Sequence, residues 1–155
     1  MTIQTGVCKE FLAELALGMH DVEDDTIKVA LYGPNANLSV ETDFYTTDGE
    51  VSGGGYSAGG ATVPLLVVGS AGSALNGGTQ FTHPYVQPTE DTSITAASVG
   101  VRGFMIYNSS KSNRAMFVGD FGETISPASG ITFSWDVANV TQFQQVLIPL
   151  IGLGI

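Results

Sequence analysis

The chain has little charge, and very little of that charge is positive. Only 13% of its 155 residues are charged, with five Lys and Arg against fifteen Asp and Glu, so the formal net charge is −10. A surface that binds DNA or RNA needs cationic side chains along the phosphates, and anionic lipid attracts cationic segments in the same way. The composition therefore argues against nucleic acid and against a membrane surface as partners.

Cysteine and long apolar runs are also scarce. The single cysteine, Cys8, cannot form an internal disulfide, and its apolar neighbours predict a buried small side chain rather than a reactive thiol. The most apolar run, residues 146–155, is too short to cross a bilayer. Residues 1–6 lack the basic start and apolar core of a signal peptide. We therefore expect a protein that does not cross a membrane.

Residues that commonly carry chemistry are few and scattered. His20 and His83 lie far apart without an acidic or cysteine pattern beside them, so they predict neither a metal site nor a catalytic triad. The acidic run Asp21–Asp25 lacks the alternating ligands, central glycine and distal glutamate of a calcium loop, which favours a solvated turn. The sequence thus predicts no enzyme activity, no catalytic residue, no metal and no cofactor.

A glycine-rich segment, VSGGGYSAGG at residues 51–60, is the most distinctive part of the chain. Glycine adopts positive φ without steric cost, so such a run favours tight turns. No Gly-Lys-Ser/Thr follows, and Ala61–Pro64 begins a β-like run instead of the helix that a phosphate loop needs. We therefore predict a connection between strands that is anchored by Tyr56.

The N-terminal region predicts one amphipathic helix over residues 5–19, with Thr5 as its N-cap and Gly18 near its end. Glu10 and Glu14 are expected on its solvent face. The apolar positions recur at spacings of three and four: Val7, Phe11, Leu12, Leu15 and Met19.

From residue 26 onward, short apolar runs separated by turn residues predict about eight β-strands. Turns are expected at Asp48-Gly49, at 108–113 and at 127–130, and a small-residue loop at 69–78. This spacing is typical of an antiparallel β-sandwich of jelly-roll or Greek-key type. We expect a single domain over residues 1–155, with the sandwich at 26–148 and an apolar tail at 149–155. Residues 26–32 alternate, with Ile27, Val29 and Leu31 on one face and Lys28 and Ala30 on the other, which predicts one buried face. The expected strands are 26–32, the short hairpin pair 44–47 and 50–51, 62–68, 79–86, 93–107, 114–121, 131–137 and 141–148.

Four segments together resemble the head decoration, or cement, proteins of tailed bacteriophages. They are GVCKEF-LAEL with the following His20, DTIKVALY, FYTTDGEVSGGGYSAGG and RGFMIYNSSKSNRAMFVGDFG, within residues 6–137. The resemblance implies a non-enzymatic virion protein on the outer capsid surface, present in the host cytoplasm during assembly. Its implied partners are the major capsid protein, whose subunits it would bridge, and itself, as a dimer or trimer.

The chain departs from that pattern in two places. Residues 79–88 lack the short acidic-aromatic strand that the resemblance leads us to expect, and the C-terminus is longer and more apolar. An exposed apolar stretch needs cover, so the tail is either a docking segment for a neighbouring subunit or a final strand with a disordered tip. The interface candidates are Leu147, Ile148, Leu150, Ile151, Leu153 and Ile155.

Other functions stay open from the residues alone. A tail or head–tail junction protein would have the same sandwich, and a carbohydrate-binding jelly-roll module would expose some of the strand aromatics. The aromatics at strand positions, for which core packing is favoured, are Phe104, Phe117, Phe121, Phe133 and Trp135. A glycoside hydrolase ranks last, because spacing alone does not pair its candidate carboxylates. Those carboxylates are Asp120, Glu123 and Asp136.

Overall fold

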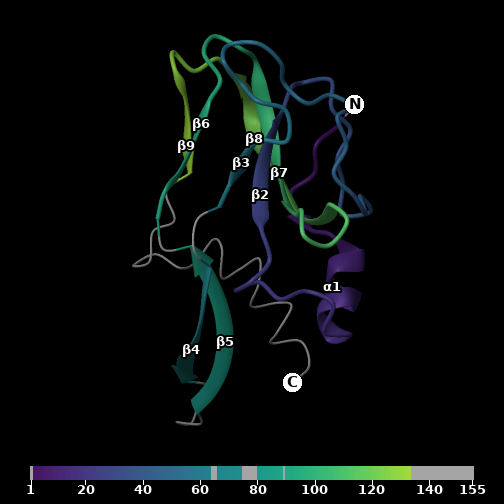
Figure 1. The fold of residues 1–155 in the computed structure, drawn as a ribbon, viewed down its shortest axis with the longest axis vertical. Helices are drawn as coiled ribbons and strands as arrows, with labels where there is room; N and C mark the ends of the chain where they lie inside the picture. Colours follow the sequence, from purple (N-terminus) through teal and green to yellow (C-terminus); the bar gives the residue numbers. More distant parts are fainter. Residues whose placement is uncertain (1, 64–65, 75–79, 89, 134–155) are drawn as a thin grey trace.

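The computed structural model describes residues 2–63, 66–74, 80–88 and 90–133, which form one helix and three antiparallel sheets (Figure 1). The chain is thus mainly β, as predicted. The described sheets do not close on one another, so the jelly-roll or Greek-key sandwich stays a prediction. The central sheet runs in the order β1 (Gly6–Val7), β8 (Arg114–Ile125), β7 (Val101–Asn108), β2 (Ile27–Tyr32) and β3 (Ala61–Thr62).

Strands β2 and β7 form the middle of this sheet and pair over the full length of β2, from Ile27 opposite Asn108 to Tyr32 opposite Gly103. The alternation of residues 26–32 predicted a strand with one buried face. In fact Ala30 and Tyr32 are as completely buried as Val29, because both faces of the strand are covered. The core of the protein therefore lies on both sides of β2.

The helix is shorter than predicted at its start. It spans Lys9–Ala16 (α1) and begins after Cys8, while Gly6–Val7 forms β1 and pairs with β8. Thr5 is not the N-cap, since its hydroxyl accepts a hydrogen bond from the Asp120 backbone N–H instead. The helix loses its expected first turn because those residues extend the sheet, and the free edge of β8 outweighs local helix preference.

The end of α1 agrees with the prediction. Gly18 has φ +69°, the Gly18 N–H donates to the Leu15 carbonyl, and the Met19 N–H donates to the Glu14 carbonyl. This pair of bonds is the Schellman pattern that ends many helices. The predicted polar face is wrong at Glu14, which is buried, while Leu12 is 36% exposed.

Two further sheets have two strands each. Strand β4 (Leu66–Ala74) pairs with β5 (Gln80–Pro88), and β6 (Thr92–Thr95) pairs with β9 (Gly130–Phe133). The strand predicted at 62–68 is interrupted at Val63, since β3 ends at Thr62 and β4 begins at Leu66. The predicted hairpin strands 44–47 and 50–51 form only isolated bridges, at Phe44 and Glu50. The loop predicted at 69–78 is wrong as far as Ala74, because β4 continues through it. The run predicted at 93–107 is two strands, β6 and β7, separated at residues 96–100.

Aromatic side chains connect the β6–β9 ladder to the central sheet. The Phe133 ring of β9 lies 5.1 Å from Phe104 of β7 and 6.2 Å from Phe121 of β8, and Phe104 also lies 5.8 Å from Phe117. These contacts agree with core packing rather than with an exposed sugar-binding platform. Trp135, the expected strand 141–148 and the apolar tail 149–155, including all six interface candidates, lie outside the described residues.

Candidate functional site

The glycine-rich segment is held to the sheet by a cluster of tyrosines around one carboxylate. Glu50 accepts hydrogen bonds from the Tyr45 hydroxyl (2.6 Å), the Tyr56 hydroxyl (2.7 Å) and the Gly59 backbone N–H (2.7 Å). The Tyr56 oxygen also accepts the Leu31 N–H of β2, at 3.1 Å. Tyr56 therefore anchors the segment as predicted, but the sequence did not reveal Glu50 as the centre of the cluster.

Two more tyrosines complete this Glu50 cluster. The Tyr107 hydroxyl donates to the Gly59 carbonyl (2.7 Å), and its ring stacks on Tyr45 with ring centroids 4.6 Å apart. The Tyr32 hydroxyl donates to the Thr46 carbonyl at 2.6 Å. Two of the four hydroxyl groups thus donate to Glu50 and the other two donate to backbone carbonyls. Together they hold residues 45–59 on the β2–β7 pair.

The four hydroxyls stay protonated well into the alkaline range. Burial raises the pKa of Tyr107 to about 12, with the nearby Glu50 charge as the second cause. Burial likewise raises the pKa of Tyr32, Tyr45 and Tyr56 well above the ordinary value, and Glu50 adds to the increase in each. Such hydroxyls act as fixed hydrogen-bond donors and not as general bases at neutral pH.

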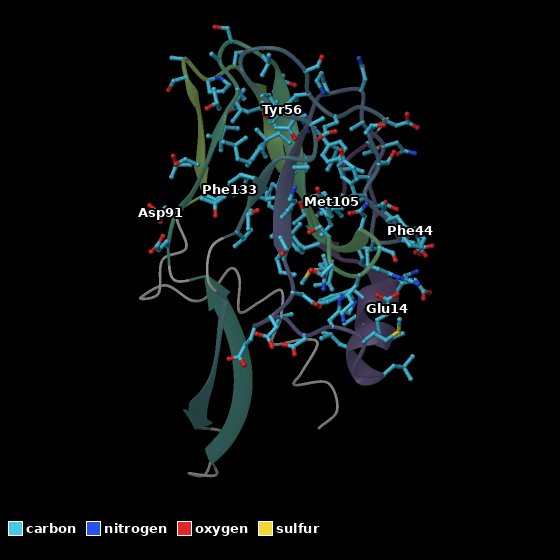
Figure 2. All side chains as sticks on the ribbon, viewed as in Figure 1. Glu14, Phe44, Tyr56, Asp91, Met105 and Phe133 are labelled. Atoms are coloured by element: carbon cyan, nitrogen blue, oxygen red, sulfur yellow. The ribbon has the colours of Figure 1, made fainter. Side chains whose placement is uncertain are left out.

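A second group of polar side chains joins α1 to the loop between β7 and β8. Figure 2 shows Glu14 on α1 beside this loop. Glu14 pairs with Arg114 and, at 2.7 Å, with the imidazole of His20, a side chain that is fully buried. The Arg114 guanidinium lies 4.8 Å from the Phe44 ring centroid. A buried carboxylate is costly unless it is paired, and these two partners offset that cost for Glu14.

Asn108 determines how this Glu14–His20 pair is protonated. Its Oδ1 accepts the backbone N–H groups of Ser110 (3.0 Å) and Lys111 (3.2 Å), which fixes the orientation of the amide. The Asn108 Nδ2 group then donates to Asp25 Oδ2 (2.7 Å) and to His20 Nδ1 (3.0 Å). Because Nδ1 must accept, the His20 proton lies on Nε2 and is donated to Glu14.

This arrangement gives the first testable prediction. Nitrogen NMR of the native protein should show His20 as the Nε2–H tautomer. Asn108→Ala should lower the free energy of unfolding by about 3 kcal/mol, since the Ser110 N–H loses its side-chain acceptor and Asp25 and His20 Nδ1 lose a donor. The matched control is Ser109→Ala in the same loop, which removes only the hydrogen bond to the Thr26 carbonyl and should cost less than about 1 kcal/mol. A proton on Nδ1, or equal losses in the two variants, would contradict the assignment.

The acidic run before β2 is a turn, as predicted, but it is not fully solvated. The Asp25 side chain is only 9% exposed. Desolvation would raise the pKa of its carboxyl, yet hydrogen bonds from Asn108 and the Asp21 N–H, together with the Lys111 charge, lower that pKa overall. Asp25 therefore connects the turn to the β7–β8 loop through hydrogen bonds and an ion pair.

The remaining sequence candidates for chemistry also have structural partners. Cys8 is buried as predicted, and burial with the nearby Asp43 charge raises the pKa of its thiol to about 12. Asp120 forms a two-point ion pair with Arg102, at 2.7 and 3.1 Å, whose hydrogen bonds lower the pKa of the carboxyl. Glu123 is exposed on β8, while His83 side-chain contacts and Asp136 lie outside the described part.

Within the described residues, every buried side-chain nitrogen or oxygen has a hydrogen-bond partner, and no group of His, Cys, Asp and Glu is placed to hold a metal ion. No helix in that part of the chain is long and apolar enough to span a membrane. Comparison with protein-family models, curated proteins and solved structures returned no match.

Proposed function

We propose that the protein is a non-enzymatic structural protein of a phage virion, which decorates and stabilises the capsid by bridging major capsid protein subunits from outside. The observation that carries this proposal is that the two clusters of polar side chains make their contacts within the protein itself. Glu50 and its tyrosines, and Glu14 with His20 and Asn108, all bind segments of the protein to its own sheet. The second support is the resemblance of residues 6–137 to decoration proteins.

The physical demands of such a role agree with these features. A cement protein needs a rigid body, and the Glu50 cluster makes the long segment 33–60 part of that body without regular strands. It needs modest contacts repeated many times, because several weak contacts made together bind far more tightly than one. Low charge density suits it too, since few charged groups must lose water when its surface packs against the shell. We also propose the jelly-roll or Greek-key sandwich as its complete architecture.

Capsid binding tests the proposal. Purified protein is added to capsids of the same phage that were assembled without it, and both binding and the temperature of capsid disruption are measured. We expect saturable binding and a higher disruption temperature, with capsids of an unrelated phage as the control. Capsids that neither bind the protein nor gain heat resistance would refute the proposed function.

A further inference from the structure

The β4–β5 hairpin forms a sheet of its own. Its register runs from Leu66 opposite Pro88, through Ser70 opposite Pro84, to Ala74 opposite Gln80. Figure 1 shows the hairpin extending away from the central sheet. Within the described parts of the chain, neither of its outer edges pairs with another strand. An isolated two-stranded hairpin is only marginally stable in water, so this one is suited to gain a further strand.

The two outer edges of the hairpin are not equivalent. Pro84 and Pro88 of β5 are four residues apart, so they lie on the same edge of that strand. A proline fits within a ladder where its nitrogen faces away from the paired strand, which here is the outer edge of β5. That edge therefore lacks two N–H donors and is poorly suited to accept another strand.

The outer edge of β4 has no such protection. Residues 66–74 contain neither proline nor charge, which are the usual devices that stop an edge strand from pairing with another chain. Ser70 is the register partner of Pro84, so its own N–H and C=O also face away from β5. The same follows for the other even-numbered residues of β4, which present a regular row of donors and acceptors.

Charge indicates what would pair with this edge. Residues 51–89 contain no Asp, Glu, Lys or Arg, although the whole chain carries a net charge of −10. Two copies of so acidic a chain repel each other over most of their surface, and the hairpin is where a close approach brings no like charges together. An uncharged edge also has nothing to attract a strongly acidic or basic partner, so a second copy of this chain is the occupant that fits.

We propose that the outer edge of β4 pairs antiparallel with β4 of a second copy around a two-fold axis at Ser70, giving a continuous four-stranded sheet. Antiparallel pairing of a strand with its own copy is symmetric by construction. All nine residues of β4 find partners only when the centre is Ser70, with Leu66 opposite Ala74. The proposal makes specific the self-association that the resemblance implies, and it does not depend on capsid binding.

Cysteine cross-linking tests the register. Ser70→Cys places two thiols directly opposite each other, at a Cα separation that a disulfide accepts. Ser73→Cys is the matched control, because its two copies would lie roughly 20 Å apart along the strands. Native Cys8 is buried and adds little background. Under mild oxidation we expect the Ser70→Cys protein to form covalent dimers at least tenfold faster than the control. Equal rates, or no dimer from either variant, would overturn the proposed register.

Dissociation in solution tests the interface without a thiol. Light scattering of the unmodified chain should show a dimer, and Ser70→Asp, which sets like charges opposite each other, should raise the dimer dissociation constant at least tenfold. A monomer, a trimer, or a dimer unaffected by Ser70→Asp would refute the pairing. These results are independent of the capsid assay, since a monomeric chain that still protects capsids refutes only the pairing, and a dimer that never binds capsids refutes only the proposed function.

Discussion

Replacing Gly60 with alanine should lower the free energy of unfolding by about 4 kcal/mol, because two costs coincide at this position. Gly60 has φ +72°, a left-handed conformation that disfavours any Cβ atom. A Cβ at this position would also lie 1.9 Å from the Val29 carbonyl oxygen, which is backbone of the central strand β2 and cannot move aside cheaply. Chemical denaturation of the variant measures the loss.

The control for this prediction is Gly122→Ala. Gly122 has φ +85°, but a Cβ there meets nothing within 4 Å, so only the left-handed backbone contributes and we expect a loss of about 1 kcal/mol. A Gly60→Ala protein as stable as the Gly122→Ala protein would mean that the glycine-rich segment does not lie against β2 as described.

Stability should fall steeply above pH 10, while remaining nearly flat from neutrality to pH 9. The pKa of Tyr107 is about 12 in the folded protein against 10.0 in the unfolded chain, and burial raises the pKa of Tyr32 as well. Below pH 10 both the folded and the unfolded chain keep these hydroxyl protons, so the two tyrosines make their full contribution to stability. Above pH 10 these tyrosines ionise first in the unfolded chain. The two together then lower the free energy of unfolding by about 3 kcal/mol per pH unit, until the hydroxyls of the folded protein ionise as well.

Denaturant unfolding at a series of pH values, with tyrosinate absorbance followed in parallel, measures this effect. The matched variant is Tyr107→Phe, which removes one titrating group and should reduce the slope of stability against pH by about 1.4 kcal/mol per unit. Tyrosines that ionise near pH 10 while the circular dichroism of the folded sheet persists would contradict the buried cluster.

Local sequence patterns predicted those parts of the fold that depend on neighbouring residues. The alternation of residues 26–32 gave β2, the polar run 108–113 gave the β7–β8 loop, and Gly18 marked the end of α1. The failures come from partners distant in sequence. Thr5 lost its capping role because Gly6–Val7 pairs with Val118 and Phe117 of β8, and no pattern near residue 5 indicates that edge.

The extent of β4 was missed for a different reason. Residues 69–74 are small and include two glycines, a composition that by itself favours a loop. Pairing with β5 overrides it, and Pro84 is tolerated because a two-stranded sheet has outer edges. Tertiary context, not intrinsic preference, decides this strand.

The polar clusters were only partly predictable. The glycines around Tyr56 indicated an anchored connection, and Tyr45 lies only five residues from Glu50, but Tyr107 reaches Gly59 from 48 positions away in the chain. His20 and Asn108 lie 88 positions apart, and neither neighbourhood contains a motif. Their contact depends on how α1 folds back onto the β7–β8 loop, which a single sequence does not encode in any local pattern.

The central claim is that many copies of this protein bridge capsid subunits, and a cryo-EM reconstruction of virions that carry it tests this claim most directly. We expect density on the outer shell between neighbouring capsomers, with a copy number comparable to that of the major capsid protein. A single ring at the portal vertex, or density on the tail or its fibres alone, would contradict the decorating role and move the protein to the junction or to host adsorption.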